Sequence, residues 1–231
     1  MILTPPMAPR RGFSKNRREA APGEGLIRPD LIQGLVASLK ARDPQTAGHC
    51  ARVTAIATRF ALSLGMPVEE VRSLGTAGII HDLGKIAVPD AILLKPGRLT
   101  LEERAVIEIH PVLGARLIKA LGLEPRVTSA VLHHHERWDG RGYPHGLSRR
   151  EIPLMARILA LADGFDALTS HRPYRSARSL PEALEELESC AATQYDPDLT
   201  PAFIDLMSGP SRVLFPPPKT LEATLVKAYT L

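Results

Sequence analysis

Aromatic residues, paired cysteines and long apolar runs are all scarce in this sequence. Aromatic residues make up 4% of the 231 residues although hydrophobic residues make up 44%, so a core of Leu, Ala, Val and Ile is expected, which suits helices better than sheets. Cys50 and Cys190 lie far apart and match no disulfide or metal-binding spacing, as is usual for free thiols in a reducing compartment. No apolar run approaches the length of a membrane span. These absences predict a cytoplasmic protein that does not enter a membrane.

The sequence also has no strand-like alternation of useful length, no nucleotide-binding glycine loop and no internal repeat. We therefore predict an all-α fold. The formal net charge is +4, and the first 28 residues, with six basic and two acidic side chains, account for all of it. The remaining chain is balanced, which predicts no specific nucleic-acid binding by the body.

Residues 1–27 are rich in Pro, Gly and Arg and lack hydrophobic periodicity, so we expect a disordered basic tail before a single domain at 28–231. The tail is either a solvated leader or a segment that touches nucleic acid or an acidic partner. Periodicity and capping signals, such as the Thr100–Glu103 capping box, predict a succession of helices in that domain. The expected helices are 30–42, 44–64, 67–83 ended by Gly84, one starting at 100, 111–121, 125–137, 152–170, 181–192, 200–208 and 219–230, with a loop at 88–97.

Histidine and aspartate occupy several positions where core residues would be expected. His49 lies on the apolar stripe of its helix, where it is either a hydrogen-bonded core residue or a ligand. His81 and Asp82 end the apolar run Ile79–Ile80, and burying an unpaired carboxylate there would be costly, so a cation nearby is expected. Asp163 sits in the middle of a strongly apolar helix, where an uncompensated charge is equally unfavourable.

Three consecutive histidines precede Glu136 near the end of another predicted helix. His134 shares a helical face with the apolar residues Val127, Ala130 and Val131, and His135 follows Val131 by four positions. We therefore expect both to face inward, whereas His133 is expected to face solvent.

Together these positions make a set too large for one tetrahedral ion and suited to two ions that share a bridging carboxylate. Imidazole and carboxylate without a cysteine favour iron or manganese over a structural zinc site. Paired metals are a recurrent device for hydrolysing phosphate esters. The seven candidate ligands are His49, His81, Asp82, His110, His134, His135 and Asp163.

The segments HDLGKIAVPD, HPVLG, HHERWDGRGYPHGL, EIPLMARILALADGFDALTSHRPYR and TQYDPDL resemble, in order, the motifs of the HD-GYP subfamily of HD-domain phosphohydrolases. The resemblance runs from roughly Asp30 to Met207. It implies a helical HD-domain bundle around a metal centre that hydrolyses cyclic di-GMP to pGpG, GMP or both, through a metal-bridging hydroxide. It also implies the same seven ligands, with Asp82 as the bridge. Gln45 stands where trinuclear members have Glu, so two divalent ions are expected.

The resemblance implies further roles around that centre. Lys85, Arg172 and Arg175 are similar to the basic set that holds the substrate phosphates, and Lys85 or water would protonate the leaving oxygen. Arg172 and Arg175 could equally be ordinary cations at a helix C-terminus. The loop Gly142-Tyr143-Pro144 is expected to border the pocket and contact a protein partner such as a diguanylate cyclase, or to be only a rigid turn.

Two other functions fit the same motifs. One is a cyclic-dinucleotide receptor or interaction module with little turnover, and the other is an HD phosphohydrolase acting on a different cyclic dinucleotide. The intact motifs favour the enzyme. A homodimer is compatible with the sequence and is not specified by it.

Overall fold

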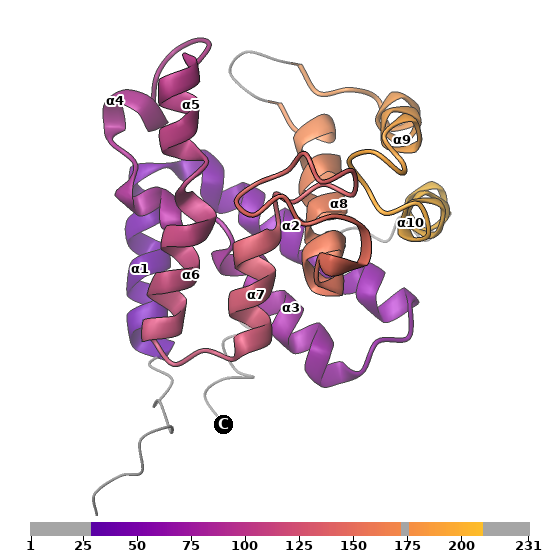
Figure 1. Ribbon diagram of the computed structural model, residues 1–231, viewed down its shortest axis with the longest axis horizontal. Coiled ribbons are helices and arrows are strands. Elements are labelled where there is room, and N and C mark those ends of the chain that lie inside the picture. Colours follow the sequence, from indigo (N-terminus) through magenta and orange to yellow (C-terminus); the bar gives the residue numbers. More distant parts are fainter. Residues whose placement is uncertain (1–28, 172–175, 210–231) are drawn as a thin grey trace, which may run out of the picture.

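The computed structural model describes residues 29–171 and 176–209, and over these ranges the chain is helical (Figure 1). The described residues form no β-strand, only an isolated bridge between Ala191 and Tyr195. The predicted all-α class is therefore confirmed. The elements are α1 (Pro29–Arg42), α2 (Pro44–Ser63), α3 (Val68–Ile80), the 3-10 helix η1 (Leu83–Ala87), α4 (Asp90–Leu93), α5 (Leu101–Ile107), α6 (His110–Ala120), α7 (Pro125–His133), the 3-10 helix η2 (Arg149–Glu151), α8 (Leu154–Thr169), α9 (Leu180–Ser189) and α10 (Leu199–Ser208).

The core is organised around α2 and α8, which pack against each other. On α2, the residues Val53, Ile56, Ala57 and Phe60 recur at helical spacing and are buried. Burying one large apolar side chain of this kind contributes roughly 1.5–3 kcal/mol. The ring of Phe60 meets that of Phe203 edge to face, with centroids 5.1 Å apart, so α10 joins the same core.

The remaining helices cover this pair from both sides. In Figure 1, α7 lies between α6 and α8 and packs against both, while α9 packs against α8 on the opposite flank with α10 beside it. Every helix within the described ranges is too short or too polar to cross a membrane.

Glycines permit two close approaches between these elements. A Cβ atom at Gly84 in η1 would overlap the carbonyl oxygen of His110 at the start of α6. A Cβ atom at Gly78 in α3 would lie 2.7 Å from Oγ1 of Thr54 in α2. The small residues therefore bring the histidine-bearing segments of α2, α3 and α6 together.

The predicted end of the third helix was wrong. That helix ends at Ile80 rather than Leu83, and Gly84 lies in the following 3-10 helix instead of serving as a C-terminal stop. His81 comes directly after the helix, and its Nδ1 lies 2.8 Å from the carbonyl oxygen of Gly78. The imidazole thus satisfies one of the carbonyl groups that a helix end leaves free.

The three consecutive histidines were predicted to lie inside a helix, but the helix ends at the first of them. Helix α7 ends at His133 rather than Arg137, and His134 and His135 belong to the turn that follows. The predicted loop at 88–97 contains the short helix α4. The expected tail at 1–27, the helix at 219–230, Arg172, Arg175 and the side chain of Gln45 lie outside the described residues.

Candidate metal centre

All seven candidate ligands meet at one place in the bundle, although they come from five separate parts of the chain. The contributing elements are α2, the turn after α3, the start of α6, the turn after α7, and α8. In that order they supply His49, then His81 and Asp82, then His110, then His134 and His135, and finally Asp163.

The ligand atoms form two groups, and within each group they lie within 4.8 Å of one another. The first group contains His49, His81 and Asp163, with His49 Nε2 3.1 Å from Asp163 Oδ1. The second contains His110, His134 and His135, and here the two Nε2 atoms of His110 and His134 are 3.4 Å apart. Each group therefore offers three donor atoms close enough together that they could hold one metal ion.

Asp82 lies between the two groups and is almost completely buried. Its Oδ1 is 3.3 Å from Nε2 of His110, in the second group. Its Oδ2 is 3.6 Å from Nε2 of His81 and 3.9 Å from Nε2 of His49, in the first group. One oxygen faces each group, which is the placement that a bridging carboxylate needs.

The backbone fixes the orientation of three of the histidine rings. In each case Nδ1–H donates to the carbonyl oxygen three residues earlier, in the last turn of the preceding helix, so that Nε2 carries the lone pair and faces the centre. The bonds are His81 to Gly78 at 2.8 Å, His110 to Ile107 at 2.8 Å and His134 to Val131 at 2.7 Å.

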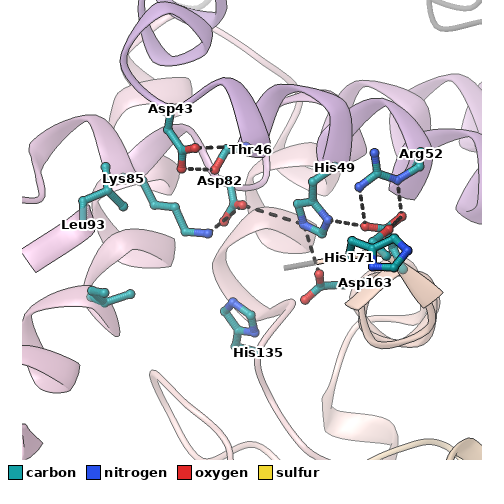
Figure 2. A pocket seen from close by; sticks show the side chains of 13 residues that line it. Asp43, Thr46, His49, Arg52, Asp82, Lys85, Leu93, His135, Asp163 and His171 are labelled. Carbon is teal, nitrogen blue, oxygen red and sulfur yellow. Dashed lines mark hydrogen bonds and ion pairs between the residues drawn. The ribbon is translucent and has the colours of Figure 1, made fainter. Parts of the chain in front are cut away.

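The ring of His49 is held by a carboxylate instead. Its Nδ1 lies 2.7 Å from Oδ2 of Asp166, and Arg52 donates to both oxygens of the same carboxylate, at 2.5 and 3.1 Å (Figure 2). We did not predict a role for Asp166 or Arg52 from the sequence. The available signal was helical spacing, because Asp166 follows Asp163 by three residues and Arg52 follows His49 by three.

Burial keeps the second group of histidines neutral in the metal-free chain. Removal from water lowers the pKa of His110 to about 3 and that of His135 to about 4, and it lowers the pKa of His134 well below the ordinary value. A neutral imidazole is the form that ligates a metal.

His49 behaves in the opposite way. Burial lowers its pKa, but hydrogen bonds to Asp163 and Asp166 outweigh this effect and raise the pKa to about 9. Burial also disfavours the Asp82 carboxylate, yet the charge of Lys85 and the nearby histidines hold the pKa of Asp82 well below its usual range. At neutral pH the carboxylates of Asp82 and Asp163 are therefore paired with Lys85 and a protonated His49. A metal ion bound at the first group would take the place of the His49 proton.

Lys85 supplies a fixed positive charge beside the bridge position. Its Nζ lies 2.7 Å from Oδ2 of Asp82, as Figure 2 shows at one edge of the pocket. Burial lowers the pKa of Lys85, but attraction to Asp82 prevails and raises it. The side chain consequently remains an ammonium at neutral pH.

Cys50 also lies near the centre, which the cysteine spacing did not indicate. Its Sγ is within 4.8 Å of ligand atoms of His81 and Asp82. Burial raises the pKa of this thiol well above its ordinary value. It stays protonated at neutral pH, and a protonated thiol is a poor ligand.

Two cavities open beside the centre, and His135 and Asp163 line both. One has a volume of about 360 Å³ and is also lined by Lys85, Arg52 and His171. The other has a volume of about 400 Å³ and lies along the loop after α7, where it is bordered by Tyr143, Arg104, Arg137 and Arg141. The arginines of the second cavity were not predicted as site residues.

The loop after α7 is fastened to the end of that helix. The buried carboxylate of Glu136 accepts the backbone N–H groups of His145 at 2.7 Å and Leu147 at 3.1 Å. A Cβ atom at Gly142 would overlap the backbone of residues 135–137, so only glycine permits this contact. Tyr143 is thereby held against His135, with ring centroids 4.8 Å apart.

The donor set fits divalent metal ions. It combines imidazole nitrogens of fixed orientation with carboxylate oxygens. His133 stays outside it, as expected, although it is half-buried rather than facing solvent. Its ring contacts Ser129 and His145 instead.

Comparison with known proteins relates this architecture to a family. Residues 35–199 match the family model described as HD domain. The chain is 43% identical over 172 residues to a cyclic di-GMP phosphodiesterase of Thermotoga maritima, covering 71% of this chain and 45% of that protein. It is 41% identical over 180 residues to the cyclic di-GMP phosphodiesterase PA4108 of Pseudomonas aeruginosa, covering 78% and 43%. The chain thus spans less than half the length of these relatives.

A solved structure shares the fold. The crystal structure of a cyclic GMP-AMP specific phosphodiesterase of Vibrio cholerae superposes with a TM-score of 0.60 at 20% sequence identity, covering 87% of this chain and 53% of that one. At 20% sequence identity, this similarity shows that the two chains share a fold.

Proposed function

The chain belongs to the HD-domain family, and we propose that it is a metal-dependent phosphodiesterase that hydrolyses cyclic di-GMP to pGpG, GMP or both. The observation that carries this proposal is the position of Asp82, with one oxygen toward each of two three-ligand groups. The relatives that are 41–43% identical are named for the same activity.

We propose that His49, His81 and Asp163 hold one ion, that His110, His134 and His135 hold another, and that Asp82 bridges them. Iron or manganese suits these donors best. Divalent ions at such a centre supply an activated water nucleophile and stabilise the charge that develops on the phosphate oxygens.

The protein groups around the centre have separate tasks in this proposal. Lys85 provides electrostatic stabilisation of the phosphate, since its raised pKa makes it a cation rather than a ready proton donor. Water then protonates the leaving 3′-oxygen. Arg172 and Arg175 follow α8 in the sequence and would bind the phosphates that the metals do not reach.

The two cavities suit a substrate with two nucleotide halves. Because both are lined by His135 and Asp163, a scissile phosphate at the centre would leave room on either side of it. Tyr143 would form part of the wall, because it is half-buried against His135. Contact between the loop Gly142-Tyr143-Pro144 and a diguanylate cyclase remains a separate proposal, which a binding assay with a Tyr143→Ala variant would test.

Purified protein tests the proposal directly. The chain is stripped of metal, reloaded with Fe²⁺ or Mn²⁺, and incubated in separate reactions with cyclic di-GMP and with 3′3′-cyclic GMP-AMP, with products separated by chromatography. We expect pGpG or GMP from cyclic di-GMP at the higher kcat/KM. Preference for cyclic GMP-AMP would support the specificity named for the V. cholerae structure, and binding without products would support a receptor.

Replacing the bridging carboxylate gives the sharpest variant. We expect Asp82→Asn to lower turnover by more than ~100-fold and to reduce the metal content, because replacing even a residue that only orients a metal ligand lowers metal affinity or activity by about 10–100-fold. Metal content is measured by atomic emission and turnover by product release. The matched control is Asp205→Asn, an exposed aspartate on α10, which should behave as the wild type. Turnover by Asp82→Asn within tenfold of the wild type would place the chemistry elsewhere.

A further inference from the structure

A second convergence of histidine and carboxylate lies outside the centre. It consists of His133 at the C-terminus of α7, Glu136 in the following turn, and His145 in the loop that Glu136 holds. One ligand atom from each of the three lies within 4.8 Å of the other two. None of the three residues belongs to the seven ligands of the proposed catalytic centre.

The spacing of the two ring nitrogens fits a tetrahedral ion. Nε2 of His133 lies 3.2 Å from Nδ1 of His145. Two nitrogens bound to one zinc ion at about 2.0–2.1 Å in tetrahedral geometry are roughly 3.3 Å apart. The corresponding distance between His110 and His134 in the catalytic centre is 3.4 Å.

The orientation of His133 is fixed as it is for the histidines of that centre. Its Nδ1 lies 2.9 Å from the carbonyl oxygen of Ser129, in the last turn of α7, so the proton of the neutral ring resides on Nδ1. The lone pair of Nε2 then points at His145. When the proton of His145 is on its Nε2, both lone pairs face the space between the rings.

Glu136 can supply a third donor without giving up its structural role. Each of its carboxylate oxygens accepts one backbone N–H, from His145 and from Leu147. A carboxylate oxygen has two lone-pair sites, so one remains on each oxygen. One of these oxygens lies within 4.8 Å of a ring nitrogen of each histidine, so an ion between the rings would bind it directly or through a water.

We propose that His133, Glu136 and His145 form a peripheral binding site for a zinc-class divalent ion. Two imidazoles and one carboxylate are a donor set that suits Zn²⁺, with water as the fourth ligand. The site is accessible from solvent because His145 is exposed and His133 is only half-buried.

An ion at this site would tie the end of α7 to the loop that contains Tyr143. That loop borders the cavity lined by Arg104, Arg137 and Arg141, and it holds Tyr143 against His135. Zn²⁺ would therefore stabilise the wall of the cavity.

Zinc binding to the whole chain tests this site. Metal-free wild type, His145→Ala and His133→Ala are equilibrated with graded concentrations of free Zn²⁺, and the bound equivalents are counted by atomic emission. We expect each variant to bind one Zn²⁺ fewer per chain than the wild type at concentrations where the wild type is saturated. We also expect Zn²⁺ beyond the equivalents of the catalytic centre to raise the Tm of the wild type and not that of the variants.

The control is His171→Ala, which removes an exposed histidine outside this cluster and should keep the wild-type zinc count. Equal zinc content and equal affinity in wild type and His145→Ala would overturn the proposal, leaving an ordinary hydrogen bond from His145 to His133. So would the loss of one equivalent in all three variants. If His133→Ala also disturbs the neighbouring His134, the His145→Ala result decides, because residue 145 lies in the loop.

Discussion

At the scale of single residues, the centre depends as much on what holds the histidines as on the histidines themselves. Of the five histidine rings, three are oriented by helix-terminal carbonyl groups and one, His49, by the carboxylate of Asp166. Arg52 neutralises Asp166 and keeps it directed at the ring. Partners of this kind set both the orientation and the basicity of a ligand.

We expect Asp166→Asn to reduce metal affinity and kcat by about 10–100-fold while leaving the fold intact. An amide has one acceptor oxygen, and His49 and Arg52 would compete for it. Equilibrium metal titration and steady-state kinetics measure the effect. Asp205→Asn, at an exposed aspartate on α10, is the matched control, and an Asp166→Asn protein with wild-type metal affinity would show that Asp166 does not position His49.

At the scale of elements, four of the seven candidate ligands lie just past the end of a helix rather than along its length. His81, Asp82, His134 and His135 all lie in turns that directly follow a helix. A helix terminus has free carbonyl groups to orient imidazoles, and a turn lets adjacent residues point to the same centre. Close contact between these turns depends on Gly84, whose missing side chain admits the carbonyl group of His110.

Gly84→Ala should therefore destabilise the protein by about 1–3 kcal/mol, the usual range for overpacking, and should also lower metal content. The control is Gly34→Ala in α1, where an added Cβ meets nothing within 4 Å. That change should be neutral or stabilise by up to about 1 kcal/mol. Urea unfolding gives both values, and equal effects of the two substitutions would contradict the role of the contact.

At the scale of the whole molecule, the buried centre makes the stability of the metal-free chain depend on pH in both directions. The folded pKa values of His110 and His135 are about 3 and 4, below the usual value of about 6.5 in the unfolded chain. The unfolded state therefore takes up protons first, and stability falls as the pH is lowered from about 6.5 toward 4. His49 has a folded pKa of about 9, so its contribution is complete below about 6.5 and is lost as the pH rises to 9.

We expect the metal-free protein to be most stable near pH ~6.5, with each histidine changing the free energy of unfolding by at most about 1.4 kcal/mol per pH unit. Urea unfolding from pH 5 to 9 measures the profile. His49→Gln should abolish the alkaline decline, whereas His171→Gln, at an exposed site, should leave the profile unchanged. A wild-type curve that keeps rising to pH 9 would contradict the assignment for His49.

The sequence by itself determined the helical class, the order of most helices and the seven residues that converge. Apolar periodicity placed His49 and His134 on inward faces, and the cost of burying Asp82 or Asp163 alone implied a cation. These conclusions depend on local spacing and on the chemistry of individual side chains, which a sequence contains. The sequence could not give the exact ends of α3 and α7. At both ends a histidine ring bonds to a backbone carbonyl group that would otherwise accept the next helical N–H group.

Only the tertiary structure decided which residues orient the candidate ligands and how those ligands separate into two sets of three with Asp82 between them. Asp166 with His49, Glu136 with the loop after α7, and Gly84 with His110 are contacts whose geometry no spacing rule specifies. The placement of Asp82 between two groups of donors likewise exists only once five segments are packed together. The physical reason is that orientation, burial and shared charge are properties of the assembled bundle, whereas the donors themselves are properties of the residues.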